Sequence, residues 1–81
     1  MTDEQALQLI AANTRRLRAA KGLSMSALAR AIGEYPMTIK RIEDGSNMPG
    51  LGLVTRLAKV FEVRVDDLLS DPKSGSMPKA S

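Results

Sequence analysis

The chain has 81 residues, with 12 Lys or Arg against 9 Asp or Glu and a formal net charge of +3. It contains no Cys and no His, which excludes disulfides, thiolate metal ligands and imidazole bases, so we expect no enzyme, no metal and no cofactor. The N-terminus is acidic and no apolar run approaches the roughly 18 residues of a membrane helix, so a single small cytoplasmic domain without membrane contact is expected.

The first predicted helix runs from Thr2 to about Lys21, and Gly22 ends it. Thr2 and Gln5 have the spacing of a capping box, in which each side chain binds the other residue's backbone N–H. The apolar face follows helical spacing, with Leu7, Ile10, Thr14, Leu17 and Lys21. The basic residues gather in the C-terminal half, where cations suit the helix dipole: Arg15, Arg16, Arg18 and Lys21.

The segment from Leu23 to Gly45 predicts two short helices joined by a tight turn. The apolar residues recur at helical spacing, with Leu28, Ala29 and Ile32 in the first helix and Ile39 and Ile42 in the second. Gly33 suits the left-handed conformation that ends a helix, and Pro36 suits the first position of the next one. Small Ala29 permits the close approach of a crossed helix pair. The pattern is typical of a helix-turn-helix.

Two further helices are expected after a turn-rich loop at residues 45–50. The apolar face of the fourth helix consists of Leu51, Val54, Leu57, Ala58 and Phe61, although Gly50 and Gly52 weaken its start. Val65, Leu68 and Leu69 predict a fifth helix with Asp66 and Asp67 in its first turn. Residues 71–81 are rich in Pro, Gly, Ser and Lys, so we expect a domain at residues 1–70 and a disordered tail at 71–81.

The chain resembles the helix-turn-helix DNA-binding domains of the Cro/repressor type, the xenobiotic-response-element-like family. Ala29, Gly33, Ile39 and Ile42 stand at the family's spacing. The further matches are Leu17, Arg18, Lys21, Gly22, Leu23 and Ser24 before the motif, and Glu43, Asp44, Gly45, Pro49, Leu57, Ala58, Lys59, Val63, Leu68 and Leu69 after it. The resemblance covers residues 7–69 and implies a compact, all-α, five-helix fold like that of lambda repressor, with the motif at helices 2 and 3.

The resemblance also implies that Arg18 pairs with Glu43 and connects the first helix to the third. We interpret this pair as structural, because breaking a partly buried ion pair from one side is costly. For Arg15 and Arg16 two interpretations stay open, a solvated face and contact with DNA phosphates.

At the start of the second helix, Ser24 is a suitable N-cap and leaves the backbone N–H groups of Met25 and Ser26 for a phosphate. The family often has glutamine at the position of Met25, and a thioether cannot replace that amide. Any phosphate contact here therefore relies on the backbone and on Ser26.

The third helix is the expected recognition helix, because domains of this type read base edges with it. Its candidates for DNA contact are Tyr35, Pro36, Met37, Thr38, Lys40 and Arg41. Pro36 and Met37 offer only apolar contact, for example to a thymine methyl group. For Met37, core or inert surface is the alternative interpretation.

The loop after the recognition helix meets phosphates in the family, and here Ser46 and Asn47 are the candidates, through side chain and backbone. Neighbouring Asp44 would repel DNA unless it turns away. The segment of the fifth helix often builds a dimer in related domains, so Val65, Leu68 and Leu69 are dimer candidates; closure of a monomer core is the alternative.

We therefore predict a sequence-specific DNA-binding transcriptional regulator, a repressor that acts as a homodimer on double-stranded DNA. Its operator would have two-fold related half-sites about 10–10.5 bp apart. The alternative is a protein-interaction module, antitoxin-like or an adaptor, with weak or no specific DNA binding. Met25, Pro36, Met37 and Asp44 favour that alternative.

Overall fold

The computed structural model describes residues 1–72 and contains five helices in them, with no strand in that range. The helices are α1 (Asp3–Ala20), α2 (Met25–Ile32), α3 (Pro36–Asp44), α4 (Leu51–Phe61) and α5 (Val65–Leu68). The expected all-α, five-helix fold is confirmed. The predicted tail at 71–81 lies outside the described residues from residue 73 onward.

The helix ends follow local sequence signals. The capping box of α1 is present, with Gln5 N donating to Thr2 Oγ1 at 3.0 Å and Thr2 N donating to Gln5 Oε1 at 2.8 Å. Gly33 ends α2 in the left-handed region at φ 74°, where a residue with a Cβ would be strained. Pro36 begins α3 and Tyr35 before it is extended, as a residue before proline must be.

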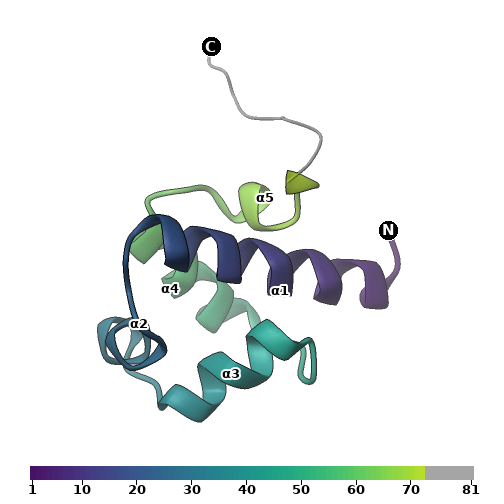
Figure 1. The fold of residues 1–81 in the computed structure, drawn as a ribbon. Coiled ribbons are helices and arrows are strands. Elements are labelled where there is room, and N and C mark those ends of the chain that lie inside the picture. The colour runs from purple at the N-terminus through teal and green to yellow at the C-terminus, as the bar shows by residue number, and fades with distance from the viewer. Residues whose placement is uncertain (73–81) are drawn as a thin grey trace.

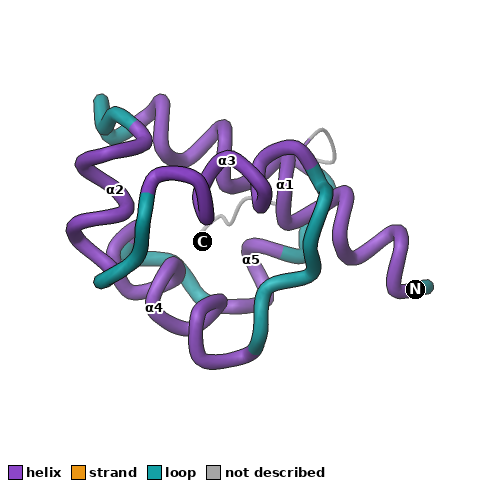
Figure 2. Tube along the Cα trace, turned by 90° about the horizontal axis from the view of Figure 1, so that it is seen from below, coloured by secondary structure: helices purple, strands orange, loops and turns teal. Residues whose placement is uncertain are grey.

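The helices form one compact arrangement around α1. Figure 1 shows α2 and α3 on one side of α1 and α5 on the other. Both views place α2 at the end of the molecule away from the N-terminus (Figures 1 and 2). α2 packs on α3 and α4, so the helix-turn-helix rests on α1 and α4 as a frame. None of the helices described is both long and apolar enough to span a bilayer.

The core lies where these helices meet. Its buried members come from all five helices: Ile10, Leu28, Ala29, Ile32, Ile39, Ile42, Val54, Leu57, Ala58, Phe61 and Leu68. Two residues of the predicted apolar faces are wrong. Leu51 is 76% exposed in the first turn of α4, and Lys21 is exposed after the end of α1, where its Nζ lies 3.0 Å from Glu62 Oε1. Gly50 is the N-cap of α4, a position where glycine costs little.

The end of α5 is attached to α1 by a buried side chain that the periodicity did not single out. Asn13 is fully buried, and its Nδ2 donates to the carbonyls of Leu68 and Ser70, each at 2.8 Å. Leu68 is the last residue of α5 and Ser70 lies two residues beyond it, where the helix itself offers no donor to the carbonyls. Asn13 therefore supplies the missing donor at the end of α5.

Candidate nucleic-acid interface

The exposed side of α3 carries most of the residues predicted to contact DNA. Tyr35 is 78% exposed and Met37 is 51% exposed, so the interpretation of Met37 as core is wrong. Pro36, Lys40 and Arg41 are also exposed, and Thr38 is half-buried. Ile39 and Ile42 of the same helix are buried against the frame. The helix thus presents one outward face that is both cationic and apolar.

A groove lies between α3 and the loop that follows it. It has a volume of about 230 Å³, and residues from α3, the loop and the start of α4 line it: Thr38, Arg41, Ile42, Asn47, Met48, Pro49, Gly50 and Leu53. The groove brings together three of the predicted contact residues, Thr38, Arg41 and Asn47. It also includes Met48, 46% exposed, which the sequence interpretation did not name.

The loop after α3 has fewer free backbone N–H groups for a phosphate than the sequence suggested. The N–H of Ser46 donates to the carbonyl of Arg41 at 2.9 Å, within the left-handed turn at Gly45 that ends α3. The expected phosphate contact through the Ser46 amide is therefore wrong for this conformation, because that donor is occupied. Ser46 and Asn47 are both exposed, so the hydroxyl of Ser46 and the side-chain amide of Asn47 are accessible.

Asp44 is paired with a neighbour on its own helix. Lys40 Nζ lies 3.1 Å from Asp44 Oδ2, an i,i+4 pair in which the side chains are 56% and 49% exposed. The pair offsets the negative charge that we expected to repel DNA. An exposed pair of this kind is weak, so Asp44 holds Lys40 only loosely.

The N-terminus of α2 has the predicted cap. Ser24 Oγ accepts a hydrogen bond from Ala27 N at 3.0 Å, and Ser26 is exposed in the first turn. Met25 is half-buried and packs against the core. Its side chain therefore fills space under the helix, and its backbone N–H is what this position can offer to an anion.

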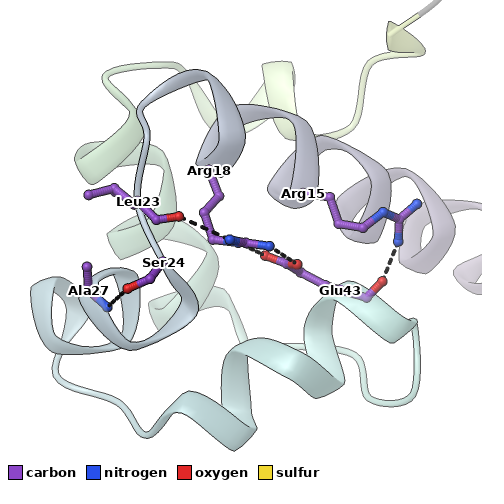
Figure 3. A network of polar contacts seen from close by, with 6 residues as sticks. All are labelled: Arg15, Arg18, Leu23, Ser24, Ala27 and Glu43. Carbon is purple, nitrogen blue, oxygen red and sulfur yellow. Dashed lines mark hydrogen bonds and ion pairs between the residues drawn. The ribbon is translucent and has the colours of Figure 1, made fainter.

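The predicted pair of Arg18 and Glu43 is present at the contact of α1 with α3 (Figure 3). Arg18 Nε donates to Glu43 Oε2 at 2.6 Å and Nη2 donates to Oε1 at 3.0 Å, while Nη1 donates to the carbonyl of Leu23 at 3.0 Å. The hydrogen bond to Glu43 raises the pKa of Arg18, an effect that burial partly opposes. One guanidinium thus connects α1, the loop before α2 and the end of α3.

Arg15 and Arg16 have partners inside the protein. Arg15 Nη1 donates to the carbonyl of Glu43, and Arg16 Nη2 donates to Asn13 Oδ1 at 3.0 Å. Figure 3 shows Arg15 and Arg18 of α1 both pointing toward Glu43. A guanidinium at the C-terminal carbonyls of a helix is favourable, so in this structure Arg15 supports α3. Both residues remain exposed.

The three dimer candidates differ in how far their side chains are exposed. Leu68 is fully buried in the core, so it is wrong as a direct dimer contact: its side chain is already used within the protomer. Val65 and Leu69 are half-buried and pack against the core. They are the two candidates of this segment with surface left for a partner.

Two structural side chains were missed by the sequence interpretation. Asn13 follows Ile10 by three residues, so helical spacing places it on the buried face, and a buried amide requires partners. Arg56 of α4 donates to the carbonyl of Ile32 in α2 at 2.5 Å. No sequence pattern marks Arg56, because its partner is distant in the chain.

Comparison with known proteins agrees with this architecture. The sequence model of the helix-turn-helix family HTH_3 matches residues 15–68. An uncharacterized HTH-type transcriptional regulator from Archaeoglobus fulgidus is 37% identical over 54 residues, covering 67% of this chain and 77% of the relative.

Two solved structures have the same fold. The hypothetical transcription factor NHTF from Neisseria superposes with a TM-score of 0.81 at 28% identity, over 91% of this chain and 86% of that one. The clp gene regulator ClgR from Corynebacterium glutamicum superposes with a TM-score of 0.74 at 25% identity, over 79% and 68%. The resemblance seen in the sequence is confirmed, and the chain belongs to the HTH_3 family of helix-turn-helix transcriptional regulators.

Proposed function

We propose that this regulator is a sequence-specific repressor that binds a two-fold related operator as a homodimer, with α3 in the major groove. The observation that carries the proposal is the outward face of α3, where exposed Met37, Lys40 and Arg41 stand on a helix whose other side is buried in the core. A helix fixed in this way can present the same side chains to every DNA site.

The chemistry of that face suits base recognition. Arg41 lies four residues after Met37, on the same side of the helix, and its planar donor fork fits the O6 and N7 acceptors of guanine. Met37 offers apolar contact to a thymine methyl group. Lys40, the N-terminus of α2 and the polar side chains of the loop supply sequence-independent phosphate contacts. A small domain bound at a promoter represses by occupying the site.

A second function has its own observation. Tyr35, Met37, Met48 and Leu51 are large apolar side chains that are 78%, 51%, 46% and 76% exposed. Exposed apolar surface also marks protein-binding sites. A protein-interaction module with weak or no specific DNA binding is therefore the competing function.

Selection from a random duplex pool separates the two functions. The protein is bound to the pool at low and moderate salt, and retained duplexes are sequenced over several rounds. The proposal expects enrichment of one motif with two-fold symmetry that persists at moderate salt, because base contacts are less salt-sensitive than phosphate contacts. Binding that disappears with salt and enriches no motif would contradict the proposal and favour the interaction module.

A further inference from the structure

The side chain of Arg56 connects α4 to the turn between the two helices of the motif. Its Nη1 donates to the carbonyl of Ile32 at 2.5 Å, and its Nη2 lies 3.3 Å from Glu34 Oε2. Its Nε donates to the carbonyl of Gly52 at 3.4 Å, one turn earlier in the same helix. Arg56 thus contacts the last residue of α2 and the middle of the turn from a helix outside the motif.

The contact to Ile32 places a positive charge at the C-terminus of α2. The last carbonyls of a helix have no partner within the helix and carry partial negative charge. The planar guanidinium can bind a carbonyl and a carboxylate at once with different nitrogens, whereas an ammonium group has its donors at one point. The position therefore suits arginine specifically.

The N-terminus of α3 has no side-chain cap. Tyr35, its N-cap, makes no side-chain capping hydrogen bond. The turn is attached to α2 by Glu34 N donating to the carbonyl of Ala29 at 2.8 Å and by Gly33 N donating to the carbonyl of Arg30 at 3.3 Å. These bonds join the turn to α2. Arg56 adds a direct hydrogen-bonded link from the turn to α4.

We propose that Arg56 is a positioning residue for DNA recognition. It sets the orientation of the start of α3, residues 35–38, against the frame, and it does so without contacting DNA. The inference rests on the proposed function, since it concerns how α3 is presented to the major groove. Only Tyr35 separates Glu34 from Pro36, the first residue of α3, so a shift of Glu34 moves the base-reading end of the helix.

The test compares variants of the full chain on the duplex that the wild-type protein selects, at several salt concentrations. Each is measured at a temperature at which its melting curve shows it folded. Arg56→Gln should weaken binding about tenfold without changing the slope of log affinity against log salt, because positioning residues modulate a distant site and release no counterion. Arg56→Lys should weaken binding nearly as much, since it keeps the charge and loses the fork.

Lys59→Gln is the matched control. Lys59 is exposed on the same helix, and replacing it changes the net charge by the same amount as Arg56→Gln. The affinity of Lys59→Gln for the duplex should stay within about twofold of wild type. Hydrogen exchange of the backbone amides of residues 33–38 should be faster in Arg56→Gln and unchanged in Lys59→Gln.

Each of the following results would overturn the inference. A salt slope lower by about one unit would make Arg56 a phosphate contact. A lower melting temperature with unchanged affinity would make its role merely structural. If the wild-type protein enriches no duplex, the proposed function fails and the inference fails with it. If Arg56→Gln does not fold, Glu34→Gln decides: about threefold weaker binding supports positioning, and unchanged binding rejects it.

Discussion

Arg18 and Glu43 form a two-point ion pair, with Nε 2.6 Å from Oε2 and Nη2 3.0 Å from Oε1, at the contact of α1 with α3. The side chain of Glu43 is 2% exposed and that of Arg18 is 21% exposed. A carboxylate removed from water to this extent depends on its partner. The pair therefore contributes to the packing of the end of α3 on α1.

Arg18→Ala should lower the free energy of unfolding by about 3 kcal/mol, because it leaves the buried carboxylate of Glu43 unpaired. DNA affinity, measured where the variant is folded, should change much less. Calorimetry and a binding titration decide. An unchanged melting temperature together with lost DNA binding would show instead that Arg18 faces phosphates.

The double variant Arg18→Met with Glu43→Leu is the control. Replacing both partners with apolar side chains of similar volume should recover most of the lost stability, because the unpaired charge is then removed. A double variant as unstable as Arg18→Ala would mean that the hydrogen bond of Arg18 to the carbonyl of Leu23, and not Glu43, carries the effect.

Thr14→Val should stabilise the protein by about 1 kcal/mol. Thr14 is fully buried, and its Oγ1 has no hydrogen-bond partner within the described part of the chain. An unsatisfied buried hydroxyl is costly, and valine keeps the shape without it. Thermal unfolding measures the change, with Thr14→Ser as control: it keeps the hydroxyl, loses the methyl group and should destabilise. A lower melting temperature for Thr14→Val would contradict this account.

Asn13→Ala should cost about 2 kcal/mol, because the carbonyls of Leu68 and Ser70 lose their donor. The loss of stability should be local: backbone amide exchange should become faster across residues 65–70 and change less in the rest of the core. Asn13→Asp keeps the size but replaces the donor with an acceptor, so it should destabilise more. Wild-type exchange rates in Asn13→Ala would show that α5 is held by packing alone.

The features of the fold that were predicted correctly are set by residues close together in the sequence. The Thr2 and Gln5 capping box, the left-handed Gly33 and the first position of Pro36 each follow from local chemistry. Leu51 was placed wrongly because the outward or inward direction of a first helical turn depends on the path of the preceding loop. Periodicity carries no information about that path.

The candidate site was predicted less completely, for the same reason. The exposed face of α3 follows from helical spacing, and the pair of Lys40 with Asp44 has i,i+4 spacing that would have revealed it. The contacts of Asn13 with Leu68 and of Arg56 with Ile32 join residues 55 and 24 positions apart. Only the packed fold brings such residues together.

The protein should be a dimer in solution or on its operator, because specificity gains from two recognition helices at a fixed separation. Val65 of α5 and Leu69, which follows the helix, are the half-buried apolar residues expected at the contact. Light scattering of the protein alone and with a two-half-site duplex tests this. A monomer that stays monomeric on that duplex and binds a single half-site would contradict it.

The most direct test of base reading by α3 is a binding titration of Arg41→Ala and Lys40→Ala against the selected duplex, its single-base variants and a scrambled duplex at several salt concentrations. Arg41→Ala should cost about 1–3 kcal/mol on the selected duplex and relax preference at one base pair. Lys40→Ala should weaken all duplexes about equally and lower the salt slope by about one unit. If Arg41→Ala instead loses affinity uniformly with no change in base preference, Arg41 is a backbone contact and does not read a base.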